Sequence, residues 1–456
     1  MLSIALSSLR FRAGIFVASF INVFLGAAIL MSFASLLDSA GSPAVSRADK
    51  NTLTTMALVI GGWGLLIVAF GVAATSTLSV RQRDTEIALL KSAGATPRQL
   101  GRMIISEVTV ISVAAAIVAI PVAFFTGRAC LAALRATNQV AGGGAYHFGV
   151  FALTVGLGDT VFAASIAAYA AARRAASLST RDALAVAAAG ERRISRKRIV
   201  FACLFLLAGI DCGVLTATVF NDRGFVTMSL AGEACIQTSI GLALFAPALM
   251  RTAAWLLGRP LQMVSRISGY LAGTNVRQRP DQATNVLMPI VVFVGLAAGS
   301  LYLQSVFNNA NAASRIAESA DGKGVETLNF IIVAMIAVFA AVVLINIAVA
   351  TTIHRRREFG QERLLGATPA QVLWMVGLES ITTAVAGLIF GTVGALAGVV
   401  PYSIARTHSA APHVGIGIYL GVVAVVVVLM AAANLGATLR AMRRPALDAI
   451  AVTSVA

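Results

Sequence analysis

The amino-acid sequence predicts an all-α polytopic membrane protein with about ten transmembrane helices. Two observations predict this class. First, 58% of the 456 residues are hydrophobic and only 12% are charged, whereas a soluble domain carries about 25% charged residues. Second, the apolar residues gather in runs, such as 56–78 and 331–350, that suit the roughly 20 residues of a membrane-spanning helix. Helices must fill such runs, because backbone amides find no water partner in lipid.

Ten apolar runs are predicted to cross the membrane. The sixth has the least definite end, because Arg251 and the residues after it could extend the span or lie along the membrane surface. The longest outer segment, at about 304–327, is polar and too short for a large extracytoplasmic domain. The predicted spans are 14–36, 53–80, 105–127, 148–171, 199–219, 234–250, 284–303, 328–352, 380–404 and 415–438.

The positions of the basic residues predict how the chain is oriented in the membrane and what its positively charged surface contacts. Lys and Arg collect in cytoplasmic loops, and the densest clusters, at 173–174, 191–198 and 355–357, fall inside if both termini are cytoplasmic. The net charge of +16 is then explained by contact with membrane lipids of the anionic inner leaflet, so no nucleic-acid partner is predicted. Richness in Ala and Arg with only four Lys is typical of a GC-rich bacterial genome, which predicts a bacterial plasma membrane.

A charged segment containing GATP occurs twice in this apolar chain, at 94–97 and at 366–369. At this offset of 272, nine of the 25 positions from Arg83/Arg355 to Glu107/Glu379 are identical. Such self-similarity indicates an internal repeat. The predicted domains are a first four-span repeat (1–185), a linker with two further spans (186–267) and a second four-span repeat (268–456). Because the span numbers are even, the two repeats are predicted to be parallel.

Each copy predicts a helix, a tight stop and a new helix that returns to the membrane. Gly94 can take the positive φ that ends a helix. Thr96 and Gln99 form a capping box, and Pro97 suits the first helical position. Gly366, Thr368, Pro369 and Gln371 repeat the pattern. An ordinary helical hairpin would explain one copy, but two copies between diverged spans indicate a surface that touches the same partner twice.

The segment resembles the signature of FtsX-like permease domains, R-x-x-E-I-x-L-L-x-x-x-G-A-T-x-x-Q-L followed by a Glu, found in the membrane subunits of MacB-like (type VII) ABC transporters. The resemblance covers both repeats and is strongest at the loop, which in that family docks on the ATPase. Two features depart from the pattern. The chain has no large outer domain, and Phe359-Gly360 replaces Ile and another small apolar residue, which predicts unequal docks. The matching residues are Arg83, Glu86, Gly94, Thr96, Pro97, Gln99, Arg355, Glu358, Gly366, Thr368, Pro369 and Gln371.

The resemblance implies a permease subunit that couples ATP hydrolysis by a separate cytoplasmic ATPase to export or extraction of a hydrophobic or amphipathic molecule, such as an antibiotic, a peptide or a lipid. Two docks in one chain predict two ATPase copies per permease. No G-x-x-x-x-G-K-[ST] loop occurs in the sequence, so ATP and Mg are expected on the ATPase. The chain itself is predicted to hold no cofactor or metal and to be no enzyme.

Two other functions remain open. The first is a non-transporting transmission subunit that activates an extracytoplasmic cell-wall enzyme or sensor partner; the short outer loops disfavour it. The second is an ion-coupled secondary transporter, which would place its repeated polar residues at the membrane midplane. Here the repeated polar residues are predicted to be cytoplasmic.

Further residues are candidates for roles inside the membrane. Glu107 and Glu379 recur where helices re-enter the membrane, which predicts anchoring to neighbouring helices. Asp159 and Asp211 fall within predicted spans, where an acid is costly and marks either a functional site or a hydrogen-bonded packing group. Small residues spaced by four predict close helix packing on the ninth span, at Gly387, Gly391, Gly394 and Gly398.

Overall fold

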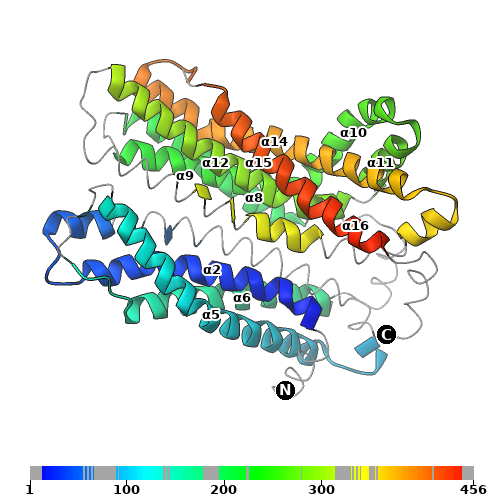
Figure 1. Cartoon of the computed structure of the whole chain (residues 1–456), viewed down its shortest axis with the longest axis horizontal. Helices are drawn as coiled ribbons and strands as arrows, with labels where there is room; N and C mark the ends of the chain where they lie inside the picture. The colour runs from blue at the N-terminus through cyan, green and yellow to red at the C-terminus, as the bar shows by residue number, and fades with distance from the viewer. Residues whose placement is uncertain are drawn as a thin grey trace. The chain divides into compact units, whose positions relative to one another are not determined.

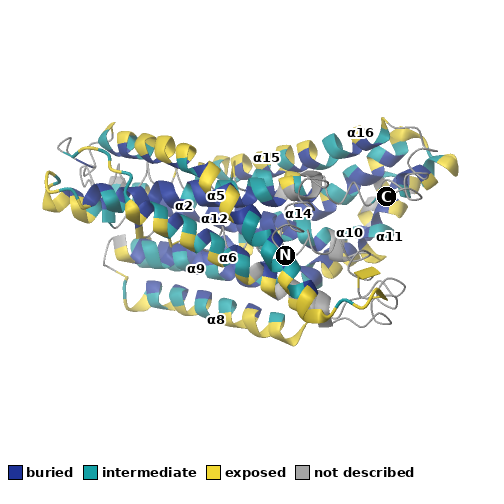
Figure 2. Cartoon of the chain, turned by 90° about the horizontal axis from the view of Figure 1, so that it is seen from below, coloured by how far each residue is buried: buried dark blue, intermediate teal, exposed yellow. Residues whose placement is uncertain are grey.

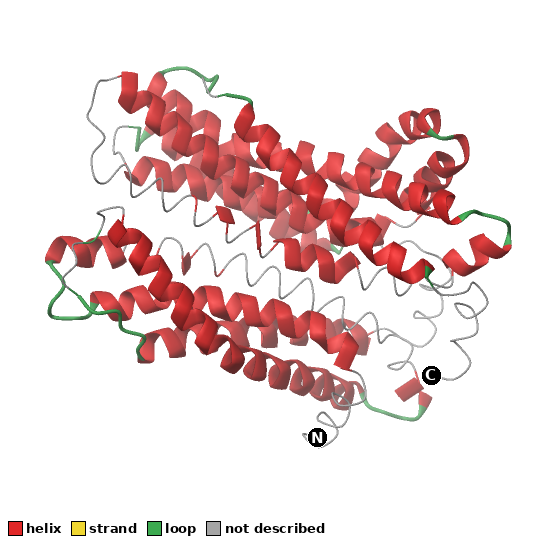
Figure 3. Cartoon of the chain, in the orientation of Figure 1, coloured by secondary structure: helices red, strands yellow, loops and turns green. Residues whose placement is uncertain are grey.

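In the computed structural model of the chain, helices dominate (Figure 3). The structure describes residues 13–54, 57–58, 61–62, 65, 89–90, 92–136, 140, 144–177, 195–221, 225–278, 280–313, 330, 333–334, 337–338, 340–348, 355, 358–412 and 415–443. These residues form helices and the turns between them, and no strand. The helices long and apolar enough to cross a membrane include Ser19–Ala40, Pro97–Ala136, Arg196–Thr218, Ala283–Asn311, Pro369–Thr407 and Gly417–Met442. The predicted class, an all-α polytopic membrane protein, is confirmed.

Two of the predicted spans, 53–80 and 328–352, lie largely outside the described residues. Each of the other predicted spans overlaps one continuous helix, except the sixth, which overlaps parts of two helices. The fourth coincides with α6 (Val150–Ser177), whose apolar part, Val150–Ile166, is shorter than a full span. The tenth is α15 (Gly417–Met430), which continues through the π-helix η1 (Ala431–Leu435) into α16 (Gly436–Met442).

The predicted bounds of the sixth span, 234–250, are wrong. Helix α9 (Phe225–Leu244) begins nine residues earlier, and α10 (Ala246–Val264) leaves it at an angle of 73°. Pro247 explains the break, because it lacks the amide hydrogen that would continue α9 and suits the first turn of a new helix. Arg251 therefore lies on α10 and not at the end of a straight span.

The predicted outer segment at 304–327 begins as a helix. Helix α12 (Pro280–Ala313) continues ten residues beyond the predicted end of its span. Gln304 donates a hydrogen bond from Nε2 to Oδ1 of Asn308, at 2.9 Å. Polar side chains four residues apart stabilise a helix in this way. The change to a polar sequence after residue 303 therefore does not mark the end of α12.

The chain divides into two compact units, residues 1–189 with 316–339 and residues 190–315 with 340–456 (Figure 1). In the first unit, α2 (Ala13–Ala40) packs against α5 (Pro97–Ala136) and α6, which also pack against each other. Small side chains allow close approach of these helices. The buried cluster consists of Ala27, Ala28, Met31, Ala116, Ala119 and Ala123.

Asp38, near the end of α2, caps the start of α6. Its carboxylate accepts hydrogen bonds from the backbone N–H groups of Gly149 (2.9 Å), Phe151 (3.3 Å) and Ala152 (2.8 Å). The first amides of a helix have no partner within it and carry a partial positive charge. The carboxylate thus satisfies amides of a helix more than 100 residues away, a contact that the sequence pattern does not reveal.

Replacing Asp38 with alanine is expected to lower the free energy of unfolding by about 2 kcal/mol, since hydrogen bonds to a charged group are lost. Asp38→Asn keeps one acceptor oxygen and should recover part of this loss, because Asn is also a good helix cap. Thermal unfolding of the solubilised protein measures both variants. Equal stability of Asp38→Ala and the unchanged protein would contradict this role.

The second unit is centred on α12 and α14 (Pro369–Thr407), and α9 packs against both. Glycines allow this approach: Gly387 and Gly391 lie against Ile290 and Val294 of α12, and Gly394 and Gly398 lie against Ser239 and Ala231 of α9. Helix α8 (Arg196–Thr218) packs on α9 and exposes its other side (Figure 2). The helices between the two repeats therefore belong to the core of the second unit.

Candidate docking site

The second GATP segment is a tight turn between two helices, as the sequence predicts. Gly366 has φ +99°, and the N–H of Ala367 donates to the carbonyl of Glu362 at 2.9 Å. This is the Schellman arrangement that closes a helix. Thr368 then starts α14 with a complete capping box. Its Oγ1 accepts from the N–H of Gln371 (3.3 Å), and its own N–H donates to Oε1 of Gln371 (2.8 Å).

The first copy has the same local structure. Gly94 has φ +91°, and the N–H of Ala95 donates to the carbonyl of Leu90 at 2.9 Å. Thr96 and Gln99 exchange capping-box hydrogen bonds of 2.9 and 3.3 Å. Pro97 and Pro369 occupy the first position of the following helices, α5 and α14. The predicted stop, cap and restart are confirmed in both copies.

The two turns expose different apolar side chains. Leu364 and Leu365, just before Gly366, are 55% and 89% exposed. The aligned positions in the first copy are Ser92 and Ala93, which are also exposed. Instead, the first copy exposes Leu89 and Leu90, one turn earlier. The sequence analysis did not single out Leu364 and Leu365, because they occupy positions that the signature leaves variable, whereas Leu89 and Leu90 are the two leucines of the signature itself.

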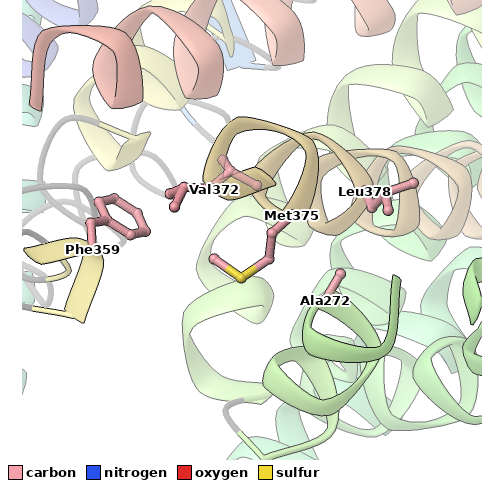
Figure 4. Packing of buried hydrophobic residues seen from close by; sticks show 6 residues of the cluster. Ala272, Phe359, Val372, Met375 and Leu378 are labelled. Carbon is pink, nitrogen blue, oxygen red and sulfur yellow. The ribbon is translucent and has the colours of Figure 1, made fainter. Parts of the chain in front are cut away.

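The exposed turn of the second copy rests on a hydrophobic cluster, shown in Figure 4. Phe359 is buried there, together with Val372, Met375, Val376 and Leu378, and contributes to packing rather than to the exposed surface. Gly360 is buried as well. The surface difference between the two turns therefore lies at Leu364 and Leu365, not at the buried Phe359 and Gly360. The cluster is completed by Ala272 of α11 (Arg266–Gln278).

Arg355 and Glu379 form an ion pair below this cluster. The guanidinium donates from both terminal nitrogens to the two carboxylate oxygens, at 2.5 and 3.1 Å. The two side chains are only 12% and 14% exposed. Burial disfavours the charge of Arg355, but the carboxylate of Glu379 outweighs this effect, so the pKa of Arg355 is raised above its usual value.

Two more contacts extend this pair. Asn275 of α11 donates from Nδ2 to Glu379 at 2.8 Å. The Arg355 guanidinium also lies 5.1 Å from the centre of the Phe359 ring, within the range of cation–π attraction. Glu358, predicted as a docking residue, is 3.4 Å from Arg355 Nε and 31% exposed. The structure thus brings Arg355, Glu358 and Glu379 together, and adds Asn275, which the sequence analysis did not single out.

The first turn also rests on apolar residues. Leu100 and Ile104 of α5 are buried and pack with Ala95, Met103 and Ile105. Glu107 is buried one turn further along α5. Arg83 and Glu86, the aligned partners of Arg355 and Glu358, lie outside the described residues.

The remaining candidates lie away from both turns. Asp159 is partly exposed on α6, and Asp211 is exposed on α8. Glu233 lies within α9, where it accepts a hydrogen bond from Gln237 at 2.7 Å. The predicted sixth span began at 234, and this shift in bounds hid an acid inside a membrane helix. Within the described part of the chain, no group of three or more His, Cys, Asp or Glu side chains could hold a metal ion.

Comparison with known families gives one match. A profile described as "FtsX-like permease C-terminal" matches residues 58–180 and 330–446, which are 123 and 117 of the 456 residues. The two matched segments begin 272 residues apart, the same offset as the two GATP turns, and each contains one turn. A search of curated proteins finds no match.

Proposed function

The chain belongs to the FtsX-like permease family, whose members are membrane subunits of ABC transporters, and from this premise we propose how it works. It couples ATP hydrolysis by a separate cytoplasmic ATPase to the export or extraction of a hydrophobic or amphipathic molecule. Each GATP turn docks one ATPase chain, so one permease engages an ATPase dimer. ATP and Mg reside on the ATPase. Both turns and both termini face the cytoplasm of a bacterial cell.

The observation that carries this proposal is the shared geometry of the two turns. Both have the same positive-φ glycine, the same Schellman hydrogen bond and the same capping box. The Schellman hydrogen bond closes the turn on one side and the capping box closes it on the other, so the turn resists deformation. A force applied to the turn therefore moves the following helix as a rigid unit. Two such turns on one chain suit a partner that is itself a dimer of identical subunits.

The helices that start at the turns are long enough to carry this motion across the membrane. Helices α5 and α14 have 40 and 39 residues, and at 1.5 Å per residue each is about 60 Å long. The hydrocarbon core of a bilayer is only about 30 Å thick. Each dock is therefore joined by a continuous helix to the opposite side of the membrane, where substrate release would occur.

Stoichiometry tests the proposal. We expect one permease to bind two copies of the ABC ATPase that co-purifies with it from its own membranes. Native mass spectrometry of the solubilised complex counts the chains. The lone permease in lipid nanodiscs should hydrolyse ATP no faster than empty nanodiscs, and addition of the ATPase should produce turnover. A complex with two permeases, or with a single ATPase at saturation, would contradict the proposal.

Transport is tested separately from docking. In proteoliposomes containing the complex, ATP should remove a dansyl-labelled amphipathic peptide from the bilayer, and a hydrolysis-deficient ATPase should abolish this effect. Normal 1:2 assembly and hydrolysis without removal of this peptide or of a labelled phospholipid would contradict the export role while leaving the docking geometry intact.

A further inference from the structure

Helices α10 and α11 form a hairpin at one end of the second unit (Figure 1). Helix α10 leaves α9 at 73°, so it runs nearly along the membrane plane if α9 crosses the membrane upright. The two helices meet at glycines, because a Cβ on Gly273 would lie 3.9 Å from the Cα of Gly258. The hairpin is thus a packed element that lies at a steep angle to α9.

One side of the hairpin is fixed to the bundle. On α11, Ser268, Ala272 and Val276 are buried, and α11 packs against α14. Ser268 Oγ donates to the carbonyl of Gln371 at 3.2 Å. Gln371 belongs to the capping box of the second GATP turn, and Asn275 contacts Glu379 about two turns further along α14. The hairpin therefore supports the second GATP turn through its hydrogen bonds from α11 to α14.

The other side of the hairpin exposes large apolar and aromatic side chains. On α10 these are Trp255 (73% exposed), Leu256 and Met263 (87% exposed). On α11 they are Ile267 and Tyr270. Trp and Tyr are enriched at the level of lipid head groups, where an apolar ring and a polar group are both accommodated. A surface helix with this composition is typical of one that lies in the membrane interface.

The charges on the hairpin have a single sign. Residues 246–278 contain four arginines, Arg251, Arg259, Arg266 and Arg277, and no Asp, Glu or Lys. Arg251 and Arg277 are exposed. Basic side chains beside an apolar interfacial face attract anionic lipid head groups.

We propose that the outer face of the α10–α11 hairpin binds the anionic phospholipid surface of the inner leaflet and holds the second GATP turn at a fixed depth. Trp255, Leu256, Met263, Ile267 and Tyr270 enter the interface, and the exposed Arg251 and Arg277 bind phosphate groups. The proposed lipid contact does not depend on the ATPase, so it can be tested independently of the proposed docking.

Tryptophan fluorescence tests this proposal, because the chain has three tryptophans. The variant Trp63→Phe with Trp374→Phe leaves Trp255 as the reporter in the full-length permease. It is reconstituted in vesicles of phosphatidylcholine with a minor fraction of phosphatidylglycerol, and bromine is placed on the acyl chains of one lipid at a time. Quenching of Trp255 per brominated molecule should be about twofold or more stronger for phosphatidylglycerol, because the arginines enrich this lipid locally.

Matched charge variants separate local from general attraction. Replacing Arg251 and Arg277 with glutamine in the reporter variant should make quenching by the two lipids equal. Replacing Arg102 and Arg440 with glutamine removes the same charge elsewhere and should leave the preference intact. Elution volume and thermal midpoint confirm that each variant is folded.

Three results would overturn the proposal. One is the absence of quenching by either brominated lipid, which would mean that the face is not in the bilayer. Another is equal quenching by the two lipids with all arginines in place. The third is loss of quenching when the ATPase is added, which would mean that protein rather than lipid covers this face in the complex.

Discussion

Replacing Leu365 with aspartate is expected to weaken binding of the ATPase at the second dock about 30-fold or more. Leu365 is the more exposed of the two leucines of the turn, and it stands on a closed, well-packed base. An exposed leucine on a rigid support is suited to fill a pocket on a partner, and loss of such a contact typically costs about 2 kcal/mol or more. A buried aspartate would add the cost of removing its charge from water.

Titration of the nanodisc-embedded permease with labelled ATPase measures this effect. Leu439→Asp is the control, since Leu439 is also an exposed leucine of the second unit but lies on α16. The first dock should be much less sensitive at the aligned position, where Ala93 offers only a methyl group, so Ala93→Asp should weaken binding less. If Leu365→Asp and Leu439→Asp bind the ATPase equally well, Leu365 is not part of the dock.

Removing one partner of the Arg355–Glu379 pair is expected to produce the largest loss of stability. The pair is mostly buried and doubly hydrogen-bonded. An uncompensated charge left at such a site costs about 3–5 kcal/mol. Both Arg355→Ala and Glu379→Ala should therefore unfold the second unit at markedly lower temperature. Arg355→Lys should recover only part of the loss, because lysine cannot donate to both carboxylate oxygens in the same geometry.

The double variant Arg355→Met with Glu379→Leu provides the sharper comparison. It removes both charges and keeps side chains of similar size, so it should be more stable than either single alanine variant. Arg277→Ala serves as a control, since Arg277 is an exposed arginine on α11. If Glu379→Ala costs no more than Arg277→Ala, the pair does not support the second turn.

The local conformation of both turns could be predicted from the sequence, because short-range rules determine it. A glycine at the end of one helix, a threonine and a glutamine three residues apart, and a proline between them leave few alternatives. The structure reproduces this geometry in each copy with nearly equal distances. The same holds for the helical class, which follows from the length and apolar character of the runs.

Contacts between distant segments could not be predicted in this way. Asp38 looks like an ordinary polar residue at the end of a span, and only the fold brings it to the start of α6. Asn275 likewise meets Glu379 across about 100 residues. The break after Leu244 did have a local signal, Pro247, but the apolar residues on both sides of it hid the change of direction.

The packing of α9 against both α12 and α14 determines where the gene can be split. A fragment cut at residue 268, the start of the second repeat, would expose the groove formed by Gly394, Gly398 and their neighbours, which Ala231 and Ser239 normally occupy. A cut near residue 190 keeps α8 and α9 with the helices that they cover. A cut near 190 therefore keeps the core of α9, α12 and α14 in one chain, whereas a cut at 268 divides that core between two chains.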